Sequence, residues 1–201
     1  LLSFKKKKII ARNKKFLRIE CIDHILTHKN FKKSKFLGST GNTARELYFL
    51  NEKKKLGHKN SFYNIGAMGH LNQIGFEIAQ KSKQKVIILE GDGSLQMHTG
   101  NLAVLGKYKN KNIIHIVFQN NTHESTGRHS VANANIDYKK IFYGFGYKKV
   151  FEVRNLNQFK KVLNKQHKCL TAIIVKIETG TINNLPRPNK KPKELKNIFI
   201  N

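Results

Sequence analysis

Apolar residues gather in short runs that polar or glycine residues separate from one another. The runs at 86–89 and 113–118 are rich in β-branched residues, and polar or glycine positions bound each of them. Such runs predict strands that are buried on both faces, as in a parallel sheet. Between them Leu95, Leu102 and Leu105 recur at roughly helical spacing. The pattern therefore predicts a strand–helix–strand unit.

The rest of the chain alternates in the same way. Helices are predicted at 16–28, from about Thr43, before Ala79, at 137–145 and at 157–167, and strands at 36–37, after Ser61, at 147–153 and at 170–177. Strands that alternate with helices favour an α/β fold built on a parallel sheet. No internal repeat is visible.

The sequence predicts three parts along the chain. At 201 residues it is long enough for one domain with a substantial core, which we place at 16–180. Residues 1–15 are rich in lysine and are predicted to be a basic tail or linker. Residues 181–201 carry all three prolines and are predicted to be an extended tail. Because the first residue is not Met, we expect either a natural subunit or a piece of a longer polypeptide.

The charge balance is strongly basic, with 39 Lys and Arg against 12 Asp and Glu and a net charge of +27. Such a balance suggests a nucleic-acid-binding protein. The lysines are scattered, however, and no RNA-recognition, zinc-finger or basic-zipper motif is visible. Lysine, asparagine and isoleucine are also abundant in chains with AT-rich coding sequences. Nucleic acid is therefore disfavoured as the main partner, and the charge favours anionic substrates and an acidic partner chain.

Cysteine usage and hydropathy indicate the compartment. Cys21 and Cys169 are far apart and lack the spacing of a metal site, which predicts a reduced, cytoplasmic chain. No apolar run approaches the length that a membrane span needs. The start of the chain also lacks the apolar segment of a signal peptide, so we expect no membrane association.

Polar side chains with metal-binding chemistry follow both strands of the central unit. A Gly-Asp-Gly turn centred on Asp92 follows the first strand, and Asn120 and Asn121 follow the second. Loops at the carboxyl ends of parallel strands are where such sheets bind ligands. A carboxylate, an amide oxygen and the free N–H groups of a helix starting near Ser94 could hold a magnesium–diphosphate group. By itself, Gly-Asp-Gly is also a common plain turn between a strand and a helix.

A second polar turn precedes the helix near Thr43. Gly41 and the hydroxyls of Ser39, Thr40 and Thr43 form a polar cup above a helix N-terminus. Such a cup suits phosphate oxygens. An ordinary capped turn has the same composition, so the residues alone leave both interpretations open.

Four stretches of the sequence together carry a more specific resemblance to known proteins: 39–50, 65–79, 91–106 and 120–127. With an asparagine placed 28 residues after Asp92, they resemble the thiamine diphosphate-dependent 2-oxo acid decarboxylases, most closely phosphonopyruvate decarboxylase. Sulfopyruvate decarboxylase chains are similar too. The resemblance spans roughly 38–175 and corresponds only to the half that binds the cofactor diphosphate. It implies a three-layer, doubly wound, mostly parallel sheet with helices on both faces.

The resemblance also implies roles for individual residues. The cofactor would contact Gly41, Asn42, Thr43, Gly66, Met68, Gly91, Asp92, Gly93, Ser94, Asn120 and Thr122. The metal, Mg²⁺, would be bound by Asp92, Asn120 and the backbone oxygen of Thr122. If the register shifts by one residue, the ligands from the second strand end would instead be Asn121 and His123.

The loop at 66–69 has a separate implied role. Met68 would support the cofactor from below in a bent shape, and the carbonyl of Gly66 would accept a hydrogen bond from its aminopyrimidine. His70 follows this loop and is a possible catalytic residue, a helix cap or a polar surface residue.

Some positions depart from the family pattern. Asn42 stands where the family has Lys, and Ala44 stands where it has Ser. Arg128 and His129 replace a Gly-Gln pair in the run that follows Asn120. A cationic pair at this place suits a phosphonate or sulfonate group.

The resemblance implies decarboxylation of 3-phosphonopyruvate to phosphonoacetaldehyde and CO₂, with thiamine diphosphate and Mg²⁺. Decarboxylation of sulfopyruvate by a two-subunit enzyme is the alternative, and a non-catalytic partner or basic binding module is a third possibility. The glutamate that activates the cofactor belongs to a pyrimidine-binding domain in this family, and Glu46, Glu77 and Glu90 do not sit in a matching motif. We therefore expect the chain to be inactive alone. It would need an α subunit or a missing N-terminal half, in a homo- or hetero-oligomer.

Overall fold

A computed structural model describes residues 16–201 of the chain, and the tail or linker predicted at 1–15 lies outside the described residues. The main strands are β1 (Lys35–Gly38), β2 (Ser61–Tyr63), β3 (Val86–Gly91), β4 (Ile113–Gln119), β7 (Lys149–Val153) and β8 (Thr171–Lys176). They form a six-stranded sheet in the order β2-β1-β3-β4-β8-β7, and every neighbouring pair is parallel. Apolar runs buried on both faces explain this arrangement, because all seven residues of β4 are buried.

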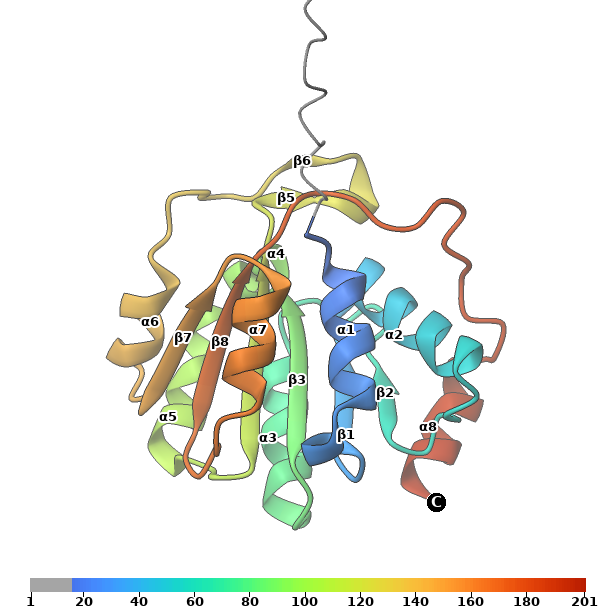
Figure 1. Cartoon of the computed structure of the whole chain (residues 1–201), viewed down its shortest axis with the longest axis horizontal. Coiled ribbons are helices and arrows are strands. Elements are labelled where there is room, and N and C mark those ends of the chain that lie inside the picture. Colours follow the sequence, from blue (N-terminus) through green and yellow to red (C-terminus); the bar gives the residue numbers. More distant parts are fainter. Residues whose placement is uncertain (1–15) are drawn as a thin grey trace, which may run out of the picture.

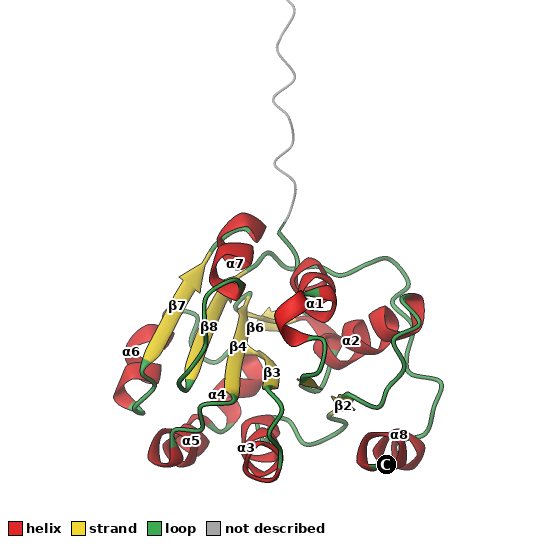
Figure 2. Ribbon diagram, turned by 60° about the horizontal axis from the view of Figure 1, so that its bottom comes forward, coloured by secondary structure: helices red, strands yellow, loops and turns green. Residues whose placement is uncertain are grey.

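Helices cover both faces of the sheet (Figure 1, Figure 2). One layer consists of α1 (Arg18–Thr27), α2 (Asn42–Lys53) and α7 (Leu156–Leu163). The other consists of α3 (Leu71–Lys81), α4 (Asp92–Met97), α5 (Leu102–Tyr108) and α6 (Tyr138–Gly144). No described helix is both long enough and apolar enough to cross a membrane. The three-layer α/β fold predicted from the sequence is confirmed.

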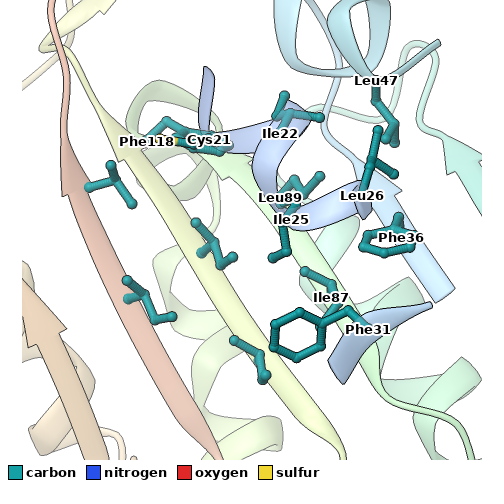
Figure 3. Close-up of a cluster of buried hydrophobic side chains, with 14 of the residues drawn as sticks. Cys21, Ile22, Ile25, Leu26, Phe31, Phe36, Leu47, Ile87, Leu89 and Phe118 are labelled. Atoms are coloured by element: carbon teal, nitrogen blue, oxygen red, sulfur yellow. The ribbon is translucent and has the colours of Figure 1, made fainter. Parts of the chain in front are cut away.

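Alternate residues of each strand feed two separate hydrophobic cores. Ile87 and Leu89 of β3 point into the core beneath α1 and α2 (Figure 3). Val86 and Ile88 of the same strand point into the core beneath α3 and α5. The period of two along a strand produces this division, and it fixes the register of β3 between the two helix layers.

The segment between β3 and β4 differs from the single predicted helix. It contains α4, a 3-10 turn (Thr99–Asn101) and α5. His98 interrupts the helix with a φ of −144° and a ψ of 51°. The polar Thr-Gly pair that follows has low helix propensity, which is consistent with a break at this point.

The C-terminal segment corrects an expectation. Residues 181–201 are not extended throughout, because α8 (Pro192–Ile200) forms within them. A proline at the first helical position is compatible with a helix start. Glu194 accepts a hydrogen bond from the backbone N–H of Lys191 at 3.1 Å, and the ring of Phe199 lies against the sheet edge at β2.

The order of the strands creates a switch point. From β1 the chain moves outward to β2, whereas from β3 it moves in the opposite direction to β4. The loops at the carboxyl ends of β1 and β3 therefore diverge and leave a crevice between them. A small antiparallel hairpin of β5 (Thr122–His123) and β6 (His129–Ser130) stands above this edge (Figure 1).

Candidate functional site

A cavity lies at the carboxyl ends of β1, β3 and β4, at the switch point. The predicted site residues among its lining are Asn42, Thr43, Met68, Gly91, Asp92, Gly93, Ser94, Asn120, Thr122 and His123. These residues come from four stretches that are far apart in the sequence. The parallel sheet brings them together because its strand ends share one edge.

Asp92 is the central residue of this cavity. It is the first residue of α4 and is only 2% exposed. Its Oδ1 accepts a hydrogen bond from the N–H of Gly93 at 2.9 Å, and its Oδ2 accepts from the N–H groups of Asn120 at 3.1 Å and Asn121 at 2.6 Å. Burial raises the pKa of Asp92, and the three N–H donors oppose this shift. A cation at the cavity would favour the ionised carboxylate further.

The asparagine pair after β4 has a defined register. Asn120 lines the cavity, and its Oδ1 accepts a hydrogen bond from the N–H of Thr122 at 3.0 Å. Asn121 has a left-handed φ of 58°, and its side chain accepts from Gln119 instead. It lines a neighbouring cavity rather than this one. The geometry therefore favours Asn120 with Thr122 as the candidate ligands over Asn121.

The donor set fits a hard cation beside an anion. Among the described residues no group of three or more His, Cys, Asp and Glu side chains is placed to hold a metal. A cation here would have one carboxylate, one amide oxygen and backbone oxygens from the protein. Mg²⁺ commonly binds through such a sparse set when phosphate oxygens complete its shell.

The N-terminus of α2 supplies the complementary anion-binding feature. No described side chain caps this helix, and its first residues, Asn42 and Thr43, line the cavity. Uncapped N–H groups and the helix dipole favour an anion at this end. Ser39 fixes the distance between the strand ends, since its hydroxyl accepts a hydrogen bond from the N–H of Gly91 at 3.2 Å. Of the two interpretations of the polar cup, the uncapped geometry favours the phosphate site.

The loop between β2 and α3 carries Met68 into the cavity. Gly66 and Gly69 of this loop have φ values of 81° and 85°, which only glycine adopts without strain. The hydroxyl of Ser94 accepts a hydrogen bond from the N–H of Gly69 at 3.1 Å. The loop is thus tied to α4, the helix that begins with Asp92.

Besides Asn121, three of the predicted cofactor-binding or catalytic residues lie outside the cavity lining. Gly41 lines an adjoining cavity, and Gly66 is exposed on the loop. His70 is exposed, makes no side-chain cap to α3, and contacts the carbonyl of Met68 at 3.2 Å. Its ring lies 4.3 Å from that of His98, centroid to centroid. His70 therefore occupies the N-cap position of α3 but makes no side-chain capping hydrogen bond.

A buried ionic cluster borders the cavity and was not predicted. Arg18 of α1 donates to Glu46 at 2.9 and 3.1 Å and to Glu124 at 3.0 Å. Burial acts to lower the pKa of Arg18, but the two carboxylates outweigh it and the pKa is raised. One signal was present in the sequence, because Arg18 lies on the same helical stripe as the apolar Cys21, Ile22 and Ile25.

A second buried polar chain runs beneath the cavity. Glu90 accepts hydrogen bonds from the hydroxyl of Ser94 at 2.8 Å and pairs with Nε2 of His115 at 2.9 Å. Nδ1 of His115 lies 3.1 Å from the hydroxyl of Tyr147, and burial followed by the charge of Glu90 raises the pKa of that tyrosine. These hydrogen-bonded side chains fix the orientation of Ser94 and, through Ser94, the loop that carries Met68.

The predicted cationic pair lies on the hairpin above the site. Arg128 and His129 are both exposed, and neither is part of the cavity lining. The His129 ring lies 5.0 Å from that of His123, which does line the cavity. The pair therefore stands near the mouth of the site and not within it.

Comparison with known proteins shows the family of this chain. Residues 38–176 match the family model for the thiamine pyrophosphate enzyme, C-terminal TPP binding domain. Phosphonopyruvate decarboxylase of Streptomyces viridochromogenes is 29% identical over 165 residues, which are 81% of this chain and 40% of that protein. The sulfopyruvate decarboxylase beta subunit of Methanocaldococcus jannaschii is 30% identical over 147 residues, 72% of this chain and 73% of that subunit.

Among solved structures, a thiamin diphosphate-dependent enzyme from Mycobacterium smegmatis has the same fold. The TM-score is 0.62 at 19% identity, over 79% of this chain and 31% of that one. The chain spans only about 40% of the length of the phosphonopyruvate decarboxylases that it matches. From the family match, this chain belongs to the thiamine pyrophosphate enzymes and contains their C-terminal TPP-binding domain.

Proposed function

We propose that this chain is the diphosphate-binding half of a 2-oxo acid decarboxylase that uses thiamine diphosphate and Mg²⁺. The observation that carries the proposal is the shared cavity of Asp92 and Asn120 beside the uncapped N-terminus of α2. Asp92 and Asn120 hold the cation with the backbone oxygen of Thr122. The N–H groups of α2 orient the diphosphate, and Met68 supports the remainder of the cofactor.

Thiamine diphosphate, when bound, supplies the nucleophilic carbon and the electron-accepting ring that decarboxylation of a 2-oxo acid needs. The residues of this chain contribute by holding the cation and the cofactor in position. Asp92, whose carboxylate is fixed by three N–H donors, holds the cation at one position without reorganisation. Such preorganisation lowers the cost of binding.

Calorimetry with thiamine diphosphate tests the metal assignment. We expect the full chain to bind the cofactor in the presence of Mg²⁺ and much more weakly in EDTA. Asp92→Ala removes the only carboxylate of the proposed cation site, and we expect a loss of roughly 30-fold in affinity, about 2 kcal/mol. The matched control is Glu77→Ala, because Glu77 is exposed on α3 and its loss changes the charge equally. Unchanged Mg²⁺-dependent binding by Asp92→Ala would contradict the proposal.

The site is proposed to be incomplete within this chain. Glu46 is engaged by Arg18 and by the hydroxyl of Thr181, and Glu90 is engaged by Ser94 and His115. Both carboxylates are buried and committed, so neither is free to activate an aminopyrimidine ring. We propose that the activating glutamate belongs to a pyrimidine-binding α subunit or to an N-terminal half.

A reconstitution assay tests this need for a partner. We expect the isolated chain to give no aldehyde above background with 3-phosphonopyruvate. Addition of a pyrimidine-binding subunit from a homologous enzyme should restore turnover, because it supplies the missing acid–base group. Robust turnover by the isolated chain would sink the proposal of a divided site.

Two substrates are compared in the same assay. We propose 3-phosphonopyruvate as the substrate, because the relative from Streptomyces viridochromogenes is named phosphonopyruvate decarboxylase. Arg128 and His129 also stand near the mouth of the cavity. Sulfopyruvate is the second candidate, because the M. jannaschii relative is a beta subunit of similar length to this chain. A higher kcat/KM for sulfopyruvate in the reconstituted enzyme would decide for the second candidate.

A further inference from the structure

A second concave surface lies at the opposite, amino-terminal edge of the sheet. Five lysines line it from three loops. Two of them precede β3, one precedes β4 and two precede β8: Lys83, Lys85, Lys111, Lys165 and Lys168. The pocket has a volume of about 710 Å³, which is within the range of small-molecule sites. We call it the basic pocket.

The positive charge of the basic pocket is uncompensated. No acidic side chain is among the described residues that line it, and none of its lysines takes part in an ion pair found in the described part of the chain. Lys85 is half-buried, and its Nζ donates to the carbonyls of Lys111, at 3.0 Å, and of His167. Burial lowers the pKa of Lys85, as expected for a cation without a counter-ion.

His167 adds a buried imidazole to the lining of the pocket. This residue lines the pocket and is only 6% exposed. Its Nε2 lies 3.1 Å from the carbonyl of Val162, whereas its Nδ1 is buried and has no hydrogen-bond partner among the described residues. Buried polar atoms are nearly always paired in native proteins. Burial lowers the pKa of His167, the charge of Lys85 lowers it further, and an anion in the pocket would oppose this shift.

We propose that the basic pocket binds a small organic anion that carries two or more phosphate groups. Lysines act as point-charge partners of phosphate, and five of them lining one hollow match a multiply charged ligand. A hollow of this volume, lined by lysines from three loops, suits a small ligand better than a nucleic-acid strand, which needs a long basic groove. The site is separate from the candidate cofactor site, because β3 and β4 run between the two edges of the sheet (Figure 1).

Inorganic tripolyphosphate is the probe, titrated into the full ¹⁵N-labelled chain in EDTA at physiological ionic strength. We expect the backbone amides of Lys85, Asn112 and Lys168 to shift, and those of Gly93 and Asn120 to stay in place. The double variant Lys111→Gln/Lys168→Gln should bind about tenfold or more weakly. Both side chains are exposed, so the fold should persist, and an unchanged amide spectrum elsewhere checks this.

The matched control is Lys193→Gln/Lys196→Gln, which removes the same charge from exposed positions on α8. We expect its affinity to change less than about twofold. An equal loss in both double variants would show general charge attraction and overturn the proposal. Shifts confined to Gly93 and Asn120 would do the same, because they would place the anion in the cofactor site. Tighter binding of single-stranded DNA that tripolyphosphate fails to displace would also overturn it.

Discussion

Replacement of Arg18 by Met is expected to lower the free energy of unfolding by about 3–5 kcal/mol. The guanidinium lies between two carboxylates, and its side chain is only 5% exposed. Without it, Glu46 and Glu124 would be left as uncompensated charges whose own exposed fractions are 0% and 6%. Burying an unpaired charge costs much more than the pair itself gains. Urea unfolding followed by circular dichroism measures the difference.

The matched control for this variant is Arg154→Met. Arg154 pairs with Glu152 at 2.7 Å, but its side chain is 64% exposed, so we expect a loss below about 1 kcal/mol. A result in which both variants lose the same small amount would show that the buried cluster is not important for stability. The cluster joins α1, α2 and the turn after β5, so Arg18→Met should also loosen one wall of the candidate site.

The central part of the fold could be predicted from local patterns. The runs at 86–89 and 113–118 are short, rich in β-branched residues and bounded by polar or glycine positions, which together favour buried strands over buried helix segments. Once both were strands of a parallel sheet, Asp92 and Asn120 had to lie at the same edge. Their proximity is confirmed by the N–H of Asn120, which donates to the carboxylate of Asp92 at 3.1 Å.

The buried polar groups could not be predicted, because their partners are distant in the sequence. Arg18 is 28 residues from Glu46 and 106 residues from Glu124. No spacing rule links such positions, and only the charge on an apolar stripe indicated that Arg18 needed a partner. In the same way, His115 interrupts an otherwise apolar strand, and its partner Glu90 stands at the end of the neighbouring one.

The C-terminal helix was missed for a different reason. Leu195, Ile198 and Phe199 recur at helical spacing in α8, but the run is short and Leu195 is the one buried residue of this helix. Its prolines and lysines are also typical of an extended tail. The helix exists because its start is capped and because Phe199 and Lys35 meet at the sheet edge, with Nζ 4.7 Å from the ring centroid. That contact is tertiary and leaves no local signal.

Replacement of Gly106 by Ala should destabilise the protein by about 3 kcal/mol or more, which is the upper range for overpacking. Gly106 is buried in α5, and an added Cβ would lie 1.6 Å from the carbonyl oxygen of Phe145 and 2.8 Å from its carbonyl carbon. Both are backbone atoms, so no side-chain rotation can relieve the clash. Alanine is favoured over glycine in a helix by about 1 kcal/mol, which is too little to offset the overlap.

The strain in Gly106→Ala should reach the polar chain beneath the site. Gly146 follows Phe145 with a φ of 86° and leads directly to Tyr147, whose hydroxyl lies 3.1 Å from Nδ1 of His115. A displaced turn would therefore move Tyr147, the buried partner of His115, which in turn pairs with Glu90. We expect Gly106→Ala to bind the cofactor more weakly as well as to be less stable.

The matched control for this variant is Gly144→Ala, at the last residue of α6. A Cβ at Gly144 would meet nothing within 4 Å, so we expect unchanged or slightly higher stability, within about 1 kcal/mol. Denaturant unfolding of both variants under one set of conditions makes the comparison. If Gly106→Ala were as stable as Gly144→Ala, α5 and the turn at Phe145 could not pack as closely as described. The expected effect of this turn on Tyr147 and its partner His115 would then be wrong too.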